Sequence, residues 1–79
     1  TPAAALKTIA VAARQVARIE KLLRQLGEEN EQLPLSRRYR QVMRQPMDLS
    51  GGERLPRLRG RLMTAVGNLA AVLQKHFLT

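Results

Sequence analysis

The apolar residues of the first 26 positions recur at intervals of four and three, and this spacing constrains the fold more than any other feature. It places apolar side chains along one side of an α-helix, as in the seam of a coiled coil. Thr1 followed by Pro2 is a typical helix start, and Gly27 is a typical C-terminal cap. We therefore expect a helix over about residues 2–26, with a seam formed by Ala5, Ile9, Ala12, Val16, Ile19, Leu23 and Leu26.

A second, shorter helix is predicted over about residues 36–45. Ser36 is suited to cap its start, and Pro46 ends it because proline lacks an N–H donor and clashes with the preceding turn. One face of this segment is apolar and consists of Leu35, Tyr39, Val42 and Met43.

A third helix is predicted over about residues 56–77. Gly51 and Gly52 interrupt the chain before it, and we expect the helix to begin near Pro56 because proline is tolerated only at a helix start. Helical spacing of apolar residues continues to the end of this segment, through Leu58, Leu62, Ala65 or Val66, Leu69, Val72 or Leu73, and Phe77.

Two connections separate these helices. Residues 27–35 include Glu28, Glu29 and Glu31 but no basic residue. We interpret this segment as an exposed link, and the alternative is an acidic latch that lies on a basic neighbour. Residues 46–55 form the second link.

These elements predict one all-α domain over residues 1–79, with two long antiparallel helices and a short middle helix, arranged as a three-helix bundle or a helical hairpin. A chain this short buries a thin core, and the short helix is unable to cover both long partners. We expect the uncovered seam to pair with a second copy or a partner helix. The candidate interface residues are Ile9, Val16, Ile19, Leu23, Leu26, Leu62, Leu69 and Leu73.

The chain is strongly basic, with 14 Lys and Arg against 6 Asp and Glu and a formal net charge of +8. Such a charge attracts polyanions. Residues 37–61 contain eight arginines and two acids, so this segment is the predicted electropositive centre. The candidate phosphate-binding residues are Arg37, Arg38, Arg40, Arg44, Arg54, Arg57, Arg59 and Arg61.

Catalysis and metal binding find little support in the residue types. The chain has no cysteine, and His76 is its one histidine, so we expect no metal site and no cofactor. Ser36 and Ser50 are better explained as helix caps than as nucleophiles. No run of about 18 apolar residues is present, so a membrane span is not expected. We predict no enzymatic activity and no catalytic residues.

Residues 39–49 resemble the bromodomain loop in which a tyrosine and two apolar residues precede Pro-Met-Asp-Leu. The matching residues are Tyr39, Val42, Met43 and 46–49. The resemblance implies a left-handed four-helix bundle that binds acetyl-lysine, with an asparagine after a tyrosine late in the chain. Here Asn68 follows Gly67, and the sequence after residue 49 accommodates one long helix where the family has three. We therefore assign no family from this segment.

The function expected from the sequence is binding of DNA or RNA, mainly through backbone phosphates, in the cytoplasm or on the nucleoid. A single Tyr and a single Phe provide no platform for stacking bases, so contacts should be led by the phosphate backbone. The alternative is a protein-interaction or oligomerisation module. In that case the apolar seams dock a partner helix, or the basic surface selects an acidic protein.

Overall fold

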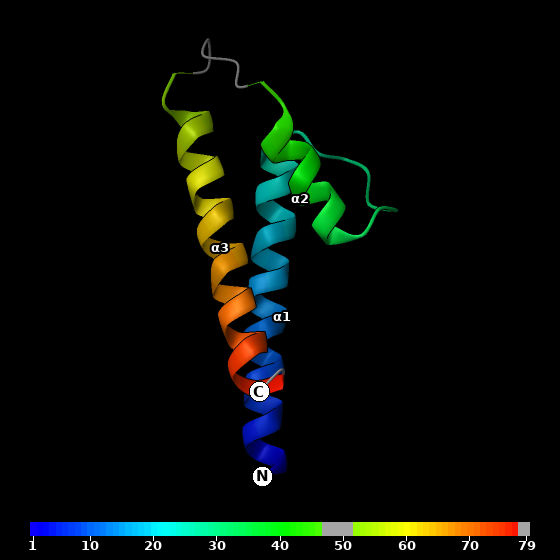
Figure 1. Ribbon diagram of the computed structural model, residues 1–79, viewed down its shortest axis with the longest axis vertical. Helices are drawn as coiled ribbons and strands as arrows, with labels where there is room; N and C mark the ends of the chain where they lie inside the picture. Colours follow the sequence, from blue (N-terminus) through cyan, green and yellow to red (C-terminus); the bar gives the residue numbers. More distant parts are fainter. Residues whose placement is uncertain (47–51, 78–79) are drawn as a thin grey trace.

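The computed structural model describes residues 1–46 and 52–77, which form three α-helices: α1 (Pro2–Gln25), α2 (Leu35–Arg44) and α3 (Arg54–Phe77). The two long helices α1 and α3 lie side by side and antiparallel, and α2 packs beside them near the end that is remote from the two termini (Figure 1). The described residues contain no strand. This arrangement confirms the prediction of an all-helical chain with two long helices and a short one between them.

Both ends of α1 agree with the prediction. At its start, the Ala4 N–H donates to the side-chain oxygen of Thr1 at 3.2 Å, and Pro2 occupies the first helical position. At its end, Gly27 adopts a positive φ of 89°, and its N–H donates to the carbonyl of Arg24. The Glu28 N–H donates to the carbonyl of Leu23 at 2.9 Å. This pair of bonds is the Schellman motif, in which a left-handed residue reverses the chain.

Helix α2 begins at Leu35, one residue earlier than predicted, and Ser36 does not cap it. The N-cap is Pro34, which makes no side-chain capping bond, and its carbonyl accepts the first intrahelical bonds. Ser36 therefore lies inside the first turn with an exposed side chain. The other end is as predicted, because Gln45 turns to an extended ψ of 138° immediately before Pro46.

Helix α3 begins at Arg54, two residues before the predicted start at Pro56. The N–H groups of a first helical turn have no intrahelical partner, so a proline at the third position loses no hydrogen bond. The first bond is instead made by the Arg57 N–H to the carbonyl of Glu53 at 3.2 Å. Half of the second predicted link, residues 47–51, lies outside the described residues, including the Met-Asp-Leu part of the bromodomain-like segment and Ser50.

The core lies in the half of the helical hairpin that α2 covers. Leu35, Tyr39 and Met43 of α2 pack against it, as the predicted apolar face requires. Toward the termini the seam is open, since Ile9 is 52% exposed and Phe77 is 50% exposed. The buried apolar residues are Ile19, Leu22, Leu23, Val42, Leu58, Leu62 and Ala65.

This core corrects part of the predicted interface. Ile19, Leu23 and Leu62 were expected to contact a partner, but each is at most 1% exposed within the single chain. Their side chains belong to the buried core of the single chain, so they stabilise the fold itself. The remaining candidates are at least partly accessible, namely Ile9, Val16, Leu26, Leu69 and Leu73.

Candidate functional site

A basic groove runs between α1 and α3. It consists of two adjoining depressions that share Gln25 and Arg61, with volumes of about 370 and 330 Å³. Leu22 and Leu58 form the apolar floor. We define the basic groove by the polar residues that line it, which are Arg18, Lys21, Gln25, Arg54, Arg57 and Arg61.

Helical spacing explains why these side chains share one groove. On α1, Arg18, Lys21 and Gln25 are separated by three and four residues, so they lie along one side of the helix. On α3, the three arginines of the groove have the same spacing. Because the helices are antiparallel, the two rows lie opposite each other and form the walls of one furrow.

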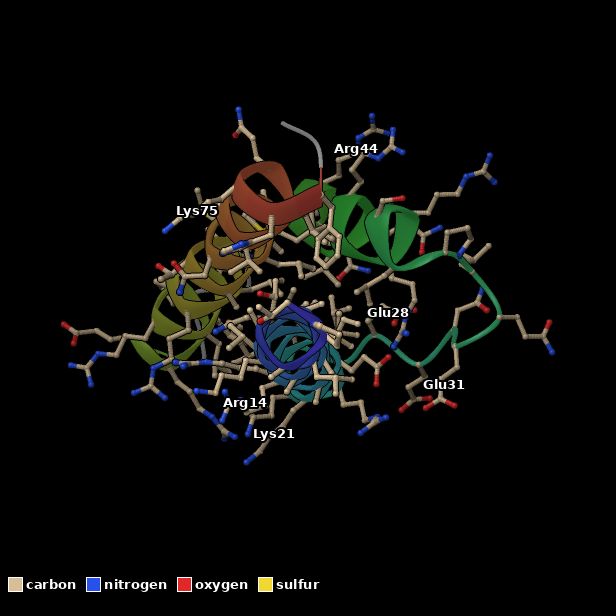
Figure 2. All side chains as sticks on the ribbon, turned by 90° about the horizontal axis from the view of Figure 1, so that it is seen from below. Arg14, Lys21, Glu28, Glu31, Arg44 and Lys75 are labelled. Carbon is tan, nitrogen blue, oxygen red and sulfur yellow. The ribbon has the colours of Figure 1, made fainter. Side chains whose placement is uncertain are left out.

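The basic surface extends along α1 beyond the groove. Arg14 precedes Lys21 by seven residues, and both side chains extend from the same side of α1, on the face of the molecule opposite α2 (Figure 2). Lys7 precedes Arg14 by the same interval. At 1.5 Å per residue, the row from Lys7 to Lys21 is about 21 Å long.

Acidic side chains lie mostly away from this groove. Figure 2 shows Glu28 and Glu31 on the connection beside α2, and Glu31 pairs with Arg24 at 3.5 Å. Among the residues that the structure describes, Glu53 is the one acid that pairs with a groove residue, Arg57 at 3.0 Å, and both side chains are more than 70% exposed. Among the described residues, no ion pair is made by Arg18, Lys21, Arg54 or Arg61. The groove therefore keeps a strong positive charge.

A second, smaller basic surface lies on the exposed side of α2. It is a shallow depression of about 190 Å³ lined by Arg37, Arg40, Gln41 and Arg44. Arg44 and Lys21 point to opposite sides of the molecule in Figure 2. The arginines that are close in the sequence, from 37 to 61, therefore belong to two separate surfaces in the fold.

Arg38 differs from its neighbours because it is buried. Its Nε donates to Glu28 Oε2 at 2.6 Å, and both side chains are 5% exposed. The other carboxylate oxygen of Glu28 accepts the N–H of Asn30 at 2.6 Å. The acidic connection is thus a latch at Glu28 and not the exposed link predicted from the sequence, and the buried Arg38 is not available to contact phosphates.

Arg59 also has a contact within the chain. It is half-buried, and its guanidinium donates to the carbonyl of Gln45 at the end of α2. Carbonyls at a helix C-terminus lack intrahelical partners and carry partial negative charge, which suits a guanidinium. Arg59 therefore connects α3 to α2 and does not line the basic groove.

The contribution of α1 to the site was not predicted from the sequence. Arg18 and Lys21 line the groove, yet charge counted along the chain pointed only to residues 37–61. The signal was present in the repeat of basic residues at positions 7, 14 and 21, with Arg18 on the same side. It becomes interpretable once α3 is placed beside α1.

No family model matches the chain, and no curated protein or solved structure shows significant similarity to it. The interpretation of the site therefore depends on its geometry and charge. None of the helices that the structure describes is long and apolar enough to cross a membrane. Within residues 1–46 and 52–77, no three His, Asp or Glu side chains are grouped as a metal ion would require.

Proposed function

We propose that this chain is a small, non-enzymatic helical module that binds DNA or RNA through backbone phosphates, with the basic groove as the main contact. The observation that supports it is the meeting of five cationic side chains from two helices, four of them without an ion pair among the described residues. Such a cluster repels itself unless an anion offsets the charge. We propose the cytoplasm or the nucleoid as its location.

The dimensions of the groove suit a row of phosphates better than a single small anion. From Arg18 to Gln25 the groove extends about 10 Å at 1.5 Å per residue, and Arg14 and Lys7 continue the row. Arginine binds phosphate with two parallel N–H donors. Recognition of the base sequence would instead require side chains that enter the major or minor groove of the nucleic acid. Gln25 is the one amide in the groove. Binding should therefore depend steeply on salt and weakly on sequence.

The proposal is tested by fluorescence anisotropy with duplex DNA, single-stranded DNA and RNA. Charge reversal in the groove, Arg18→Glu with Arg61→Glu, should weaken binding at least about tenfold, because two attractive contacts become repulsive. The matched control is Arg37→Glu with Arg44→Glu on α2, which makes the same change in net charge and should have a smaller effect. Absence of binding to all three ligands at low salt contradicts the proposal, as does an equal loss in both variants.

An assembly or protein-interaction role is the alternative proposal, and the open end of the hairpin supports it. Leu6 is 67% exposed and Ile9 is 52% exposed on α1, while Phe77 is 50% exposed on α3. An interaction module would lose partner capture when Ile9 and Leu73 are made polar and would retain it when groove arginines are reversed. Leu23 is unsuitable for this test because it is fully buried and its replacement would unfold the chain.

A further inference from the structure

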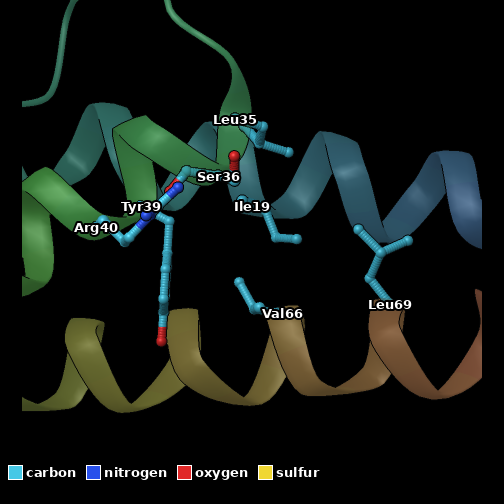
Figure 3. Close-up of a pocket in the computed structure, with 7 residues that line it drawn as sticks. All are labelled: Ile19, Leu35, Ser36, Tyr39, Arg40, Val66 and Leu69. Carbon is cyan, nitrogen blue, oxygen red and sulfur yellow. The ribbon is translucent and has the colours of Figure 1, made fainter.

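Helix α2 is too short to cover the side of the hairpin on which it packs. It has 10 residues, and α1 and α3 have 24 each, which correspond to about 15 Å and 36 Å. Where α2 begins, the furrow between α1 and α3 opens into a pocket of about 310 Å³ (Figure 3). Its lining is largely apolar and consists of Ile19, Leu35, Ser36, Tyr39, Arg40, Val66 and Leu69.

Helical spacing carries this apolar lining from the pocket toward the termini. On α1, Val16 and Ile9 precede Ile19 along the same side of the helix. On α3, Leu73 and Phe77 follow Leu69 at intervals of four. We call this surface the open apolar face. It comprises Ile9, Val16, Val66, Leu69, Leu73 and Phe77, and the buried Ile19 lines the pocket at its inner end.

The accessible surface of the chain is larger than that expected of a folded monomer of its mass. A folded monomer of 8.9 kDa is expected to expose about 4,800 Å², whereas this chain exposes 5952 Å². The difference is about 1,100 Å², and one partner of a standard protein interface buries about 800 Å². The excess surface is therefore sufficient for a stable interface.

The charge pattern favours a second copy of the chain as the occupant. Two copies with a formal charge of +8 each repel one another and associate only where charges are absent. Helix α3 carries no charged residue from Leu62 to Gln74, and the open apolar face contains none. The basic groove lies on the other side of the hairpin, so the two grooves stay apart when two open faces meet, and Arg40 of α2 lies at the edge of the pocket.

The two ends of the open apolar face also complement each other in shape. At one end is the pocket, and at the other Phe77 is 50% exposed. Phe77 follows Leu69 by eight residues, or about 12 Å along α3. A cavity of about 150 Å³ holds a benzene molecule, so the pocket has room for a phenyl ring.

We propose that two copies pair through the open apolar face about a twofold axis, with Phe77 of each copy inserted into the pocket of the other. If a twofold axis lies midway between the pocket and the ring, each copy inserts its Phe77 into the other at the same time, as an isologous interface requires. In the resulting bundle, the hairpin of the second copy lies next to α2 and covers the part of α1 and α3 that α2 leaves exposed. Both basic grooves remain on the outer sides of the dimer.

Sedimentation equilibrium of the full chain tests the proposal. The wild type should associate to twice its monomer mass, and Phe77→Ala should weaken the dimer at least about tenfold because two buried rings are lost. The control is Thr64→Ala: Thr64 is exposed and lies two positions from both Leu62 and Val66, on the opposite side of α3 from the open apolar face, so its replacement should not affect association. A monomer at all concentrations, or a dimer unchanged by Phe77→Ala, overturns the proposal.

A photo-cross-link tests the same contact without removing the ring. Benzoylphenylalanine in place of Phe77 should produce a covalent dimer joined to residues 35–40 or 66–69 of the second copy, and the same group in place of Thr64 should not. Cross-links elsewhere, or equal yields from both positions, contradict the insertion. Neither test changes a charge, so failure of the dimer leaves the proposed phosphate contacts of the groove standing.

Discussion

At the scale of single residues, the buried pair of Arg38 and Glu28 shows how a charge can serve the fold. The left-handed turn at Gly27 redirects the chain, and the next residue, Glu28, faces α2. Nothing in the acidic run distinguishes Glu28 from Glu29, so the sequence did not reveal which one is buried. Arg38 precedes buried Val42 by four residues, and this spacing was a signal that its side chain points inward.

We predict that Glu28→Ala lowers the free energy of unfolding by about 3 kcal/mol or more, because it leaves the Arg38 charge buried without a partner. The double variant Glu28→Ala with Arg38→Met should recover most of this loss, since no buried charge remains. Urea unfolding measures both, and Glu29→Ala, at an exposed position, is the control. A single-variant loss below about 1 kcal/mol would show that the pair is dispensable.

Gly60 provides a second prediction at this scale. A Cβ added to Gly60 meets no atom within 4 Å, and its φ is not positive, so Gly60→Ala should raise the free energy of unfolding by about 0.5 to 1 kcal/mol. Gly27 also has open space but requires a φ of 89°, and Gly27→Ala should therefore be destabilising. Thermal unfolding of the two variants should shift in opposite directions, and shifts of the same sign contradict this explanation.

At the scale of elements, signals within a few residues predicted the helices well, and signals that depend on neighbours did not. The Thr1 cap and the Gly27 turn are local, and both ends of α1 were predicted. Helices α2 and α3 start one and two residues earlier than predicted. Pro34 is tolerated just before the first turn of α2, and Pro56 is tolerated within the first turn of α3. The position of α2 against the hairpin depends on contacts between distant residues, and no local pattern determines it.

The hydrogen bond from Arg59 to the Gln45 carbonyl should contribute measurably to the stability of the packing between α2 and α3. We expect Arg59→Ala to lower the free energy of unfolding by about 1 to 2 kcal/mol, because it removes a charged donor from the end of α2. Arg54→Ala is the matched control, since Arg54 is exposed and makes no ion pair with the described residues; its effect should stay within about 0.5 kcal/mol. Urea unfolding at one pH and salt concentration decides, and equal losses would contradict the assigned role.

At the scale of the whole molecule, the fold separates three surfaces that the sequence mixes. The basic groove lies on one side of the hairpin and the open apolar face on the other, and the arginines of α2 form a third surface that adjoins the pocket at Arg40. Charge counted along the chain merged the first two, and it omitted Arg18 and Lys21 because the arginines of α3 that lie opposite them are distant in the sequence. Their position becomes evident only when α1 and α3 are placed antiparallel.

The dependence of duplex binding on salt tests the central claim most directly, because each neutralised phosphate contributes about −0.9 to the slope of log K against log salt. If the basic groove holds phosphates, Arg18→Gln with Arg61→Gln should make the slope about 2 units shallower than in the wild type. Arg37→Gln with Arg44→Gln, which makes the same change in charge on α2, should make it less than 1 unit shallower, about one contact at most. A wild-type slope retained by the groove variant would show that the groove does not contact the nucleic acid.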